Sequence, residues 1–138
     1  MKRISFRFAA PMAIVLCLTM VSAVGYAQVP DPNDILEMAI YFADTSSTDD
    51  LPDSLVNYDI TDSGLIASMF GGIEADTLRD CSDLEADTDA FVYVRFNDLT
   101  RKVYHLILEW SHFHEKGDEG NCHWVNPVSR SLFEANAQ

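Results

Sequence analysis

The segment that says most about the fold is Phe91–Phe96, which consists almost entirely of β-branched and aromatic residues. Such residues favour strands because their side chains pack well on a pleated surface. Asn97 and Asp98, which are typical turn residues, come next, and a second strand-like pattern covers Lys102–Trp110. These two segments predict an antiparallel hairpin with a connection of about five residues, and therefore a fold built on a sheet.

The region Ile35–Ala43 fits two templates. Every second residue from Leu36 to Phe42 is apolar, which indicates a strand with one buried face. A helix that begins near Asp31 is the alternative, because a Pro follows a capping residue there. We predict the strand, and we predict a second extended segment at Leu55–Ile60.

One amphipathic helix is predicted over residues 62–73. Thr61 or Asp62 can cap its start, because their side-chain oxygens accept hydrogen bonds from the free backbone N–H groups of the first turn. Its apolar residues recur at spacings of one, three and four, which gives the helix one apolar face. The pair Gly71-Gly72 is expected to end it, since glycine readily takes the backbone angles that terminate helices.

The chain is predicted to close with a short strand at Cys122–Val125 and a short helix that begins at Asn126-Pro127, a capping residue followed by proline. The resulting order is β-β-α-β-β-β-α. Neighbouring strands joined by short turns indicate an α+β fold. We expect a small antiparallel sheet of four to five strands, packed on the helix at 62–73.

The N-terminal segment has the composition of a secretory signal. Three basic residues and no acidic residue precede an apolar stretch at Met12–Val24, and Gly25-Tyr26-Ala27 ends it with small residues at the cleavage positions. We predict that residues 1–27 are removed between Ala27 and Gln28 and that the protein is secreted or periplasmic. A retained membrane anchor is the alternative, because the apolar run approaches the ~20 residues needed to span a bilayer.

Removal of this segment leaves 111 of the 138 residues, which fits one domain at 28–138. It also removes Cys17 and leaves Cys81 and Cys122. An even pair of cysteines in a small exported domain predicts a disulfide. In the chain-entropy model a closed loop of this length stabilises the fold by about 4 kcal/mol.

The charge balance is strongly acidic. All 22 acidic residues follow Ala27 but only six of the nine basic residues do, so 22 negative against six positive charges give the mature chain a net charge of −16. Such a surface repels nucleic acids and anionic membranes and attracts cationic partners. The plainer interpretation is that the charge serves solubility or suits a salty medium, where it is screened.

Chemistry-bearing motifs are sparse. His112 and His114 share one face of a strand, and His123 follows across a turn, so these three histidines are candidate metal ligands with Glu109 or Glu115 as a carboxylate. No metal-ligand motif of the H-E-x-x-H or C-x-x-C type supports the cluster. No serine-nucleophile motif is present either. We therefore expect no cofactor.

Aromatic residues near the last hairpin are the remaining candidates. Trp124, Phe113 and His123 are predicted to contact a partner, since aromatic residues are enriched at protein interfaces. Trp110 shares strand parity with apolar residues and is expected in the core. The sequence thus favours a non-catalytic binding domain, comparable in size, compartment and charge to small periplasmic inhibitors of basic enzymes such as lysozyme. A metal-binding protein or hydrolase that uses the histidines of segment 105–123 is the alternative.

Overall fold

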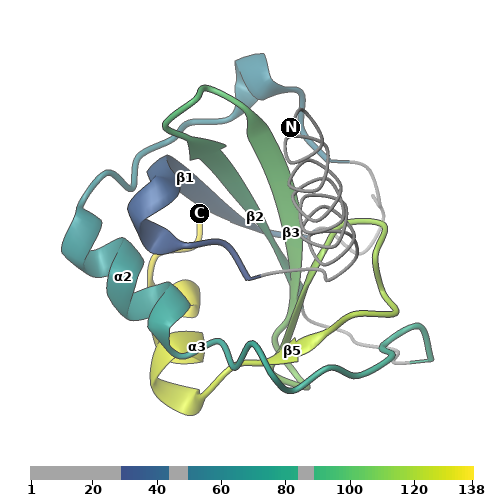
Figure 1. The fold of residues 1–138 in the computed structure, drawn as a ribbon. Helices are drawn as coiled ribbons and strands as arrows, with labels where there is room; N and C mark the ends of the chain where they lie inside the picture. The colour runs from purple at the N-terminus through teal and green to yellow at the C-terminus, as the bar shows by residue number, and fades with distance from the viewer. Residues whose placement is uncertain (1–28, 44–49, 84–88) are drawn as a thin grey trace, which may run out of the picture.

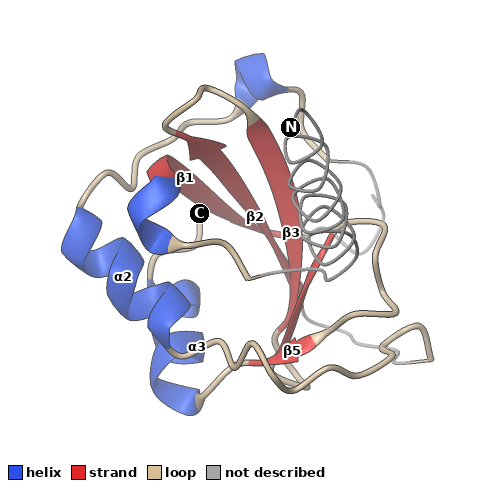
Figure 2. Ribbon diagram, viewed as in Figure 1, coloured by secondary structure: helices blue, strands red, loops and turns tan. Residues whose placement is uncertain are grey.

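In the part of the chain that the structure describes, the fold consists of one antiparallel sheet with two α-helices on one of its faces (Figures 1 and 2). The computed structural model describes residues 29–43, 50–83 and 89–138. The predicted signal segment lies outside these ranges. None of the helices within the described ranges is long and apolar enough to cross a membrane. The predicted α+β class is confirmed.

The sheet has five strands in the order β1-β2-β3-β4-β5, with each strand antiparallel to the next along the chain. The elements in chain order are the 3₁₀ turn η1 (Pro32–Asp34), β1 (Ile35–Phe42), the 3₁₀ turn η2 (Asp53–Leu55), α2 (Ser63–Gly71), β2 (Asp89–Phe96), β3 (Arg101–Ile107), β4 (His112–Glu115), β5 (His123–Trp124) and α3 (Pro127–Ala135).

The number of strands agrees with the prediction, but two assignments were wrong. Leu55–Ile60 is not a strand: Leu55 ends the turn η2, and only Ile60 pairs with the sheet, through a single bridge to Met38. The predicted strand Lys102–Trp110 stops at Ile107, and β4 is a separate strand. The observed order is therefore β-α-β-β-β-β-α.

Both helices begin where their local sequence predicts, and α2 also ends at the predicted glycine pair. The Asp62 side chain accepts a hydrogen bond from the Leu65 N–H at 2.9 Å, and α2 ends at Gly71. The Asn126 side chain accepts from the Ser129 N–H at 2.8 Å at the start of α3. These bonds satisfy backbone donors that the first turn of a helix leaves without partners.

The main core lies between the sheet and the two helices. The helix α2 was expected to cover the sheet, and α3 also contributes to this core. Phe133 of α3 is completely buried, and so are Met38 and Ile40 of β1. Leu36 and Phe42 share the parity of these β1 residues but are exposed. The pairing of β1 with β2 shifts register between Ile35 and Glu37, and Ile35 is buried in place of Leu36.

The second face of the sheet is also covered, by residues 50–58. This segment is held by ion pairs from β2, from β3 and from the residue after β4: Arg95 reaches Asp53 at 2.8 Å, and Arg101 and Lys116 reach Asp50 at 3.1 and 3.0 Å. Val56 of this segment packs with Ala39 of β1 and with Phe91 and Tyr93 of β2 to form a smaller core. Three of the chain's few basic residues are therefore used to fasten this segment to the sheet.

Two adjacent glycines at the end of α2 are expected to respond oppositely to substitution. A Cβ at Gly72 would lie 1.9 Å from the Ser129 Oγ and 2.6 Å from the Asn126 Oδ1, whereas a Cβ at Gly71 meets nothing within 4 Å. We expect Gly72→Ala to lower the free energy of unfolding by about 1–3 kcal/mol through overpacking at the start of α3. Gly71→Ala is expected to raise it by about 0.5–1 kcal/mol, because alanine costs less backbone entropy in a helix. Urea denaturation followed by circular dichroism measures both, and equal effects would contradict this packing.

Candidate functional site

The residues predicted to bind a partner do not form one surface. Phe113 and His123 are 1% and 3% exposed, so only Trp124, at 36%, reaches the solvent. Trp110, which the strand pattern places in the core, is 45% exposed. The structure thus removes Phe113 and His123 from the candidate partner-binding residues and adds Trp110. We refer to Trp110 and Trp124 as the tryptophan surface.

Trp110 is exposed because the strand alternation is interrupted at Leu108–Ser111. Ser111 has a φ of +53°, which is left-handed backbone that costs an L-residue about 1–2 kcal/mol. Ser111 is held there from two directions: its carbonyl accepts from the Val125 N–H and its hydroxyl accepts from the Arg130 guanidinium, both at 2.8 Å. Strained backbone of this kind persists only where the surroundings enforce it, and it is a reason to look for function nearby.

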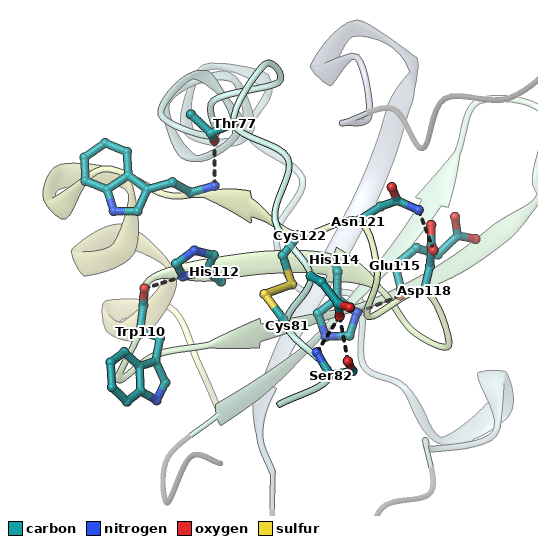
Figure 3. Close-up of a disulfide and its surroundings, with 12 residues drawn as sticks. Thr77, Cys81, Ser82, Trp110, His112, His114, Glu115, Asp118, Asn121 and Cys122 are labelled. Carbon is teal, nitrogen blue, oxygen red and sulfur yellow. Dashed lines mark hydrogen bonds between the residues drawn. A yellow bond between two sulfur atoms is a disulfide. The ribbon is translucent and has the colours of Figure 1, made fainter. Parts of the chain in front are cut away.

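Trp124 is connected to the same region through β4. In the pairing of β4 with β5, Trp124 lies opposite His112, and the His112 Nδ1 contacts the Trp110 carbonyl. The backbone N–H of Trp124 donates to the Thr77 Oγ1 at 3.0 Å. Figure 3 shows Trp110 and His112 together at one end of β4. Both tryptophans are thus presented from backbone that is bonded on several sides.

The predicted disulfide is present and supports this end of the sheet. Cys81 and Cys122 are buried, 6.0 Å apart at their Cα atoms, and pack against Ile107. Arg79 pairs with Cys122 through a backbone β-bridge, and Ile73 pairs with Val125 in the same way. The segment 73–81 therefore follows the outer edge of β5. In the view of Figure 3 the disulfide lies between the side chains of His112 and His114. The short strand β5 is therefore held on one edge by β4 and on the other edge by the segment 73–81.

A pocket of about 360 Å³ adjoins the Trp110 turn. Its lining comes from the end of β1, the turn between β3 and β4, and α3: Phe42, Leu108, Glu109, Arg130 and Glu134. The Arg130 Nη1 donates to Ser111, and its Nε lies 3.9 Å from a Glu134 carboxylate oxygen. The lining of this pocket thus combines apolar side chains with two carboxylates and one guanidinium.

The three candidate metal-ligating histidines do not converge. His123 pairs with Phe113, so it lies on the helix side of the sheet, opposite to His112 and His114. Each imidazole has its Nδ1 beside a backbone carbonyl: that of Glu74 for His123, and that of a residue one or two positions away for the other two. Within the parts of the chain that the structure describes, no three His, Cys, Asp or Glu side chains are grouped to hold a metal ion.

His114 instead is buried beside the partly exposed His105. Its ring lies edge-on to that of His105, with centroids 5.1 Å apart, and the His105 Nε2 is 2.6 Å from an Asp89 carboxylate oxygen. His114 is only 2% exposed, and its Nε2 has no hydrogen-bond partner among the described residues. Burial has the largest effect and lowers the pKa of His114. The hydrogen bond to the Glu115 carbonyl opposes it, His105 lowers the pKa further, and Glu119 and Asp118 raise it by smaller amounts.

This lowered pKa makes a prediction about acid stability. Below pH ~6.5 the unfolded chain binds a proton at His114, whereas the folded chain takes it up only at lower pH. Proton binding therefore favours the unfolded chain, so the free energy of unfolding is unaffected by His114 above that pH and decreases as the pH falls below it. We expect His114→Phe, which cannot titrate, to lose less unfolding free energy than the wild type between about pH 8 and pH 5. Urea denaturation at each pH measures the difference, and parallel losses in the two proteins would exclude His114 as a cause.

Comparison with models of protein families, with curated proteins and with solved structures finds no match to this chain. The arrangement of its own side chains is therefore the basis for assigning a function. Within the described residues that arrangement presents two exposed tryptophans, a braced turn and an adjoining pocket.

Proposed function

We propose that this chain is an exported, non-catalytic binding domain whose tryptophan surface docks onto a cationic protein. The observation that carries the proposal is the exposure of Trp110 and Trp124, at 45% and 36%, at one end of the sheet. Tryptophan is among the residues that dominate the binding energy of protein interfaces. Two such side chains kept in solvent by the fold are better explained by a partner than by stability.

The backbone around these side chains supports the same function. Trp110 precedes Ser111, whose strained conformation is fixed by Arg130 and Val125, and Trp124 is tied to Thr77. A surface that is already ordered before binding loses less conformational entropy when the partner arrives. The strain at Ser111 is then the cost of displaying Trp110 in a fixed position.

Charge indicates the type of partner. If the N-terminal segment is removed as its composition predicts, the remaining chain carries a net charge of −16. Its field would accelerate encounter with a basic protein and disfavour anionic ones. The disulfide Cys81–Cys122 supports export to an oxidising compartment. An inhibitor that covers the surface of a basic enzyme is the mode of action that fits these features.

The test uses the purified protein and a panel of basic proteins that includes lysozyme. Calorimetric titration at about 20 mM salt should detect binding, and binding should weaken at about 300 mM salt because charges are screened. Trp110→Ala and Trp124→Ala should each weaken it by about tenfold or more, as expected for interface hot spots. Leu36→Ala is the matched control, since Leu36 is 44% exposed elsewhere on the sheet.

Two outcomes would overturn the proposal. One is the absence of binding to every basic protein of the panel at low salt. The other is that Trp110→Ala and Trp124→Ala weaken binding no more than Leu36→Ala does, because the tryptophan surface would then contribute nothing specific to binding. Circular dichroism of each variant confirms that the fold is unchanged.

A further inference from the structure

We refer to residues 50–58, which cover the second face of the sheet, as the strap. Val56 is the only residue of the strap that is buried, and residues 52–55 and Asn57 are exposed. Segments with few buried apolar contacts are the ones that open locally while the rest of a protein stays folded. Just after the strap, the bridge of Ile60 to Met38 attaches the chain to β1 again and sets the limit of such an opening.

Partly exposed ion pairs hold the strap to the sheet. Asp50 is bound from two sides, by Arg101 at 3.1 Å and by Lys116 at 3.0 Å. Arg95 donates two hydrogen bonds to the Asp53 carboxylate, at 2.8 and 3.0 Å. The side chains of these five residues are between 23% and 48% exposed. Water and salt therefore reach the pairs, and ion pairs in such positions weaken as salt screens them.

Two tyrosine hydroxyls hold the backbone of the strap. The Leu51 N–H donates to the Tyr93 hydroxyl at 3.0 Å, and the Asn57 N–H donates to the Tyr41 hydroxyl at 2.9 Å. Both amides bond to side chains of the sheet and not to another residue of the strap. Their hydrogen exchange with water therefore reports whether the strap is attached.

The side chains beneath the strap are aromatic and basic. Tyr93 and Phe91 are only 1% and 8% exposed while the strap is in place. The guanidinium carbon of Arg101 lies 5.3 Å from the centroid of the Tyr93 ring, and the Lys116 Nζ lies 5.4 Å from that of Phe91. A lifted strap would leave these rings accessible beside cations that have lost their carboxylate partners.

We propose that the strap is a salt-sensitive cover, which separates from the sheet as one unit when its ion pairs weaken and thereby exposes this aromatic and basic face. The sheet itself stays intact, because β1, β2 and β3 pair with one another and pack on the main core at the opposite face. This device goes beyond the proposed function, which uses the tryptophan surface and does not involve the strap.

The first experiment follows amide hydrogen exchange of the wild type by nuclear magnetic resonance at about 20 and about 300 mM salt. The Leu51 and Asn57 amides should be less protected than that of Met38, which bonds to the Ile60 carbonyl at 2.9 Å. Higher salt should accelerate exchange at both strap amides together, by about threefold to tenfold, and leave Met38 unchanged. Protection of the strap amides equal to that of Met38, or exchange without a response to salt, would overturn the proposal.

The second experiment removes the carboxylate that two cations share. In Asp50→Asn the strap amides should exchange at low salt about as fast as those of the wild type do at high salt. The dye anilinonaphthalene sulfonate, which binds exposed apolar surface, should fluoresce more with this variant than with the wild type. Glu134→Gln is the matched control, because it removes a partly exposed ion pair with Arg130 on α3. If Asp50→Asn behaves like Glu134→Gln, the proposal fails. If Asp50→Asn does not fold, exchange in the wild type alone decides.

Discussion

Phe113→Ala is expected to lower the free energy of unfolding by about 3–5 kcal/mol, the range for removal of a buried aromatic ring. Phe113 is 1% exposed and stacks on Tyr104 with ring centroids 4.9 Å apart. It also contacts Phe70 and Phe133 at centroid distances of 5.8 and 6.1 Å, so it connects β4 to both helices. Alanine would leave a cavity at the centre of the main core. Urea denaturation measures the loss.

The same position distinguishes a core role from a binding role. Phe113→Leu retains most of the buried volume and is expected to fold with a smaller loss, below about 1.5 kcal/mol. Because Phe113 is enclosed by the core, this variant should bind a basic partner as tightly as the wild type does, in contrast to Trp110→Ala. A loss of affinity comparable to that of Trp110→Ala, with the fold intact, would contradict the burial of Phe113.

The second large effect is expected from the disulfide. Replacing Cys81 and Cys122 together by alanine should lower the free energy of unfolding by about 2–5 kcal/mol, and the chain-entropy model gives about 4 kcal/mol for a loop of this length. The cysteines are 41 residues apart and are buried against Ile107. Alanine is preferred to serine because a buried hydroxyl without a partner would add a separate cost.

Reduction provides the control for the disulfide. A reducing agent should destabilise the wild type by a similar amount and leave the double-alanine variant unchanged. Hydrogen exchange should also become faster at the Arg79 and Cys122 amides, which bond to each other's carbonyls across the outer edge of β5. Equal stability of the two proteins in the absence of reductant would show that the cross-link contributes little to the fold.

Local signals explain which parts of the fold were predictable. The caps at Asp62 and Asn126 depend on residues three positions away, and both were confirmed. The hairpin of β2 and β3 depends on strand-forming runs around a short turn, and its existence was also predicted. The Cys81–Cys122 pair needed only a count of cysteines and a compartment. The caps and the hairpin depend on interactions within a few residues of one another. The disulfide was predictable because two cysteines can pair in only one way.

Errors arose where distant residues decide the conformation. Leu55–Ile60 has strand-like residues, but ion pairs from Arg95 to Asp53 and from Arg101 to Asp50 hold residues 50–58 as a cover on the second face. Alternation along β1 predicts one buried face, whereas Ala39 is buried on the other. A strand pattern describes two faces correctly only when one of them meets solvent.

The sequence by itself determined the class of the fold, the caps of both helices, the pairing of the cysteines and the excess of negative charge, because each follows from neighbouring residues or from simple counts. Only the tertiary structure decided which aromatic residues are available to a partner. Trp110 is exposed because Val125 and Arg130, 14 and 19 residues further along the chain, hold Ser111 in a left-handed conformation. The sequence does not indicate this conformation, because the position is not a glycine. Phe113 is buried because β4 is a separate strand that lies against both helices.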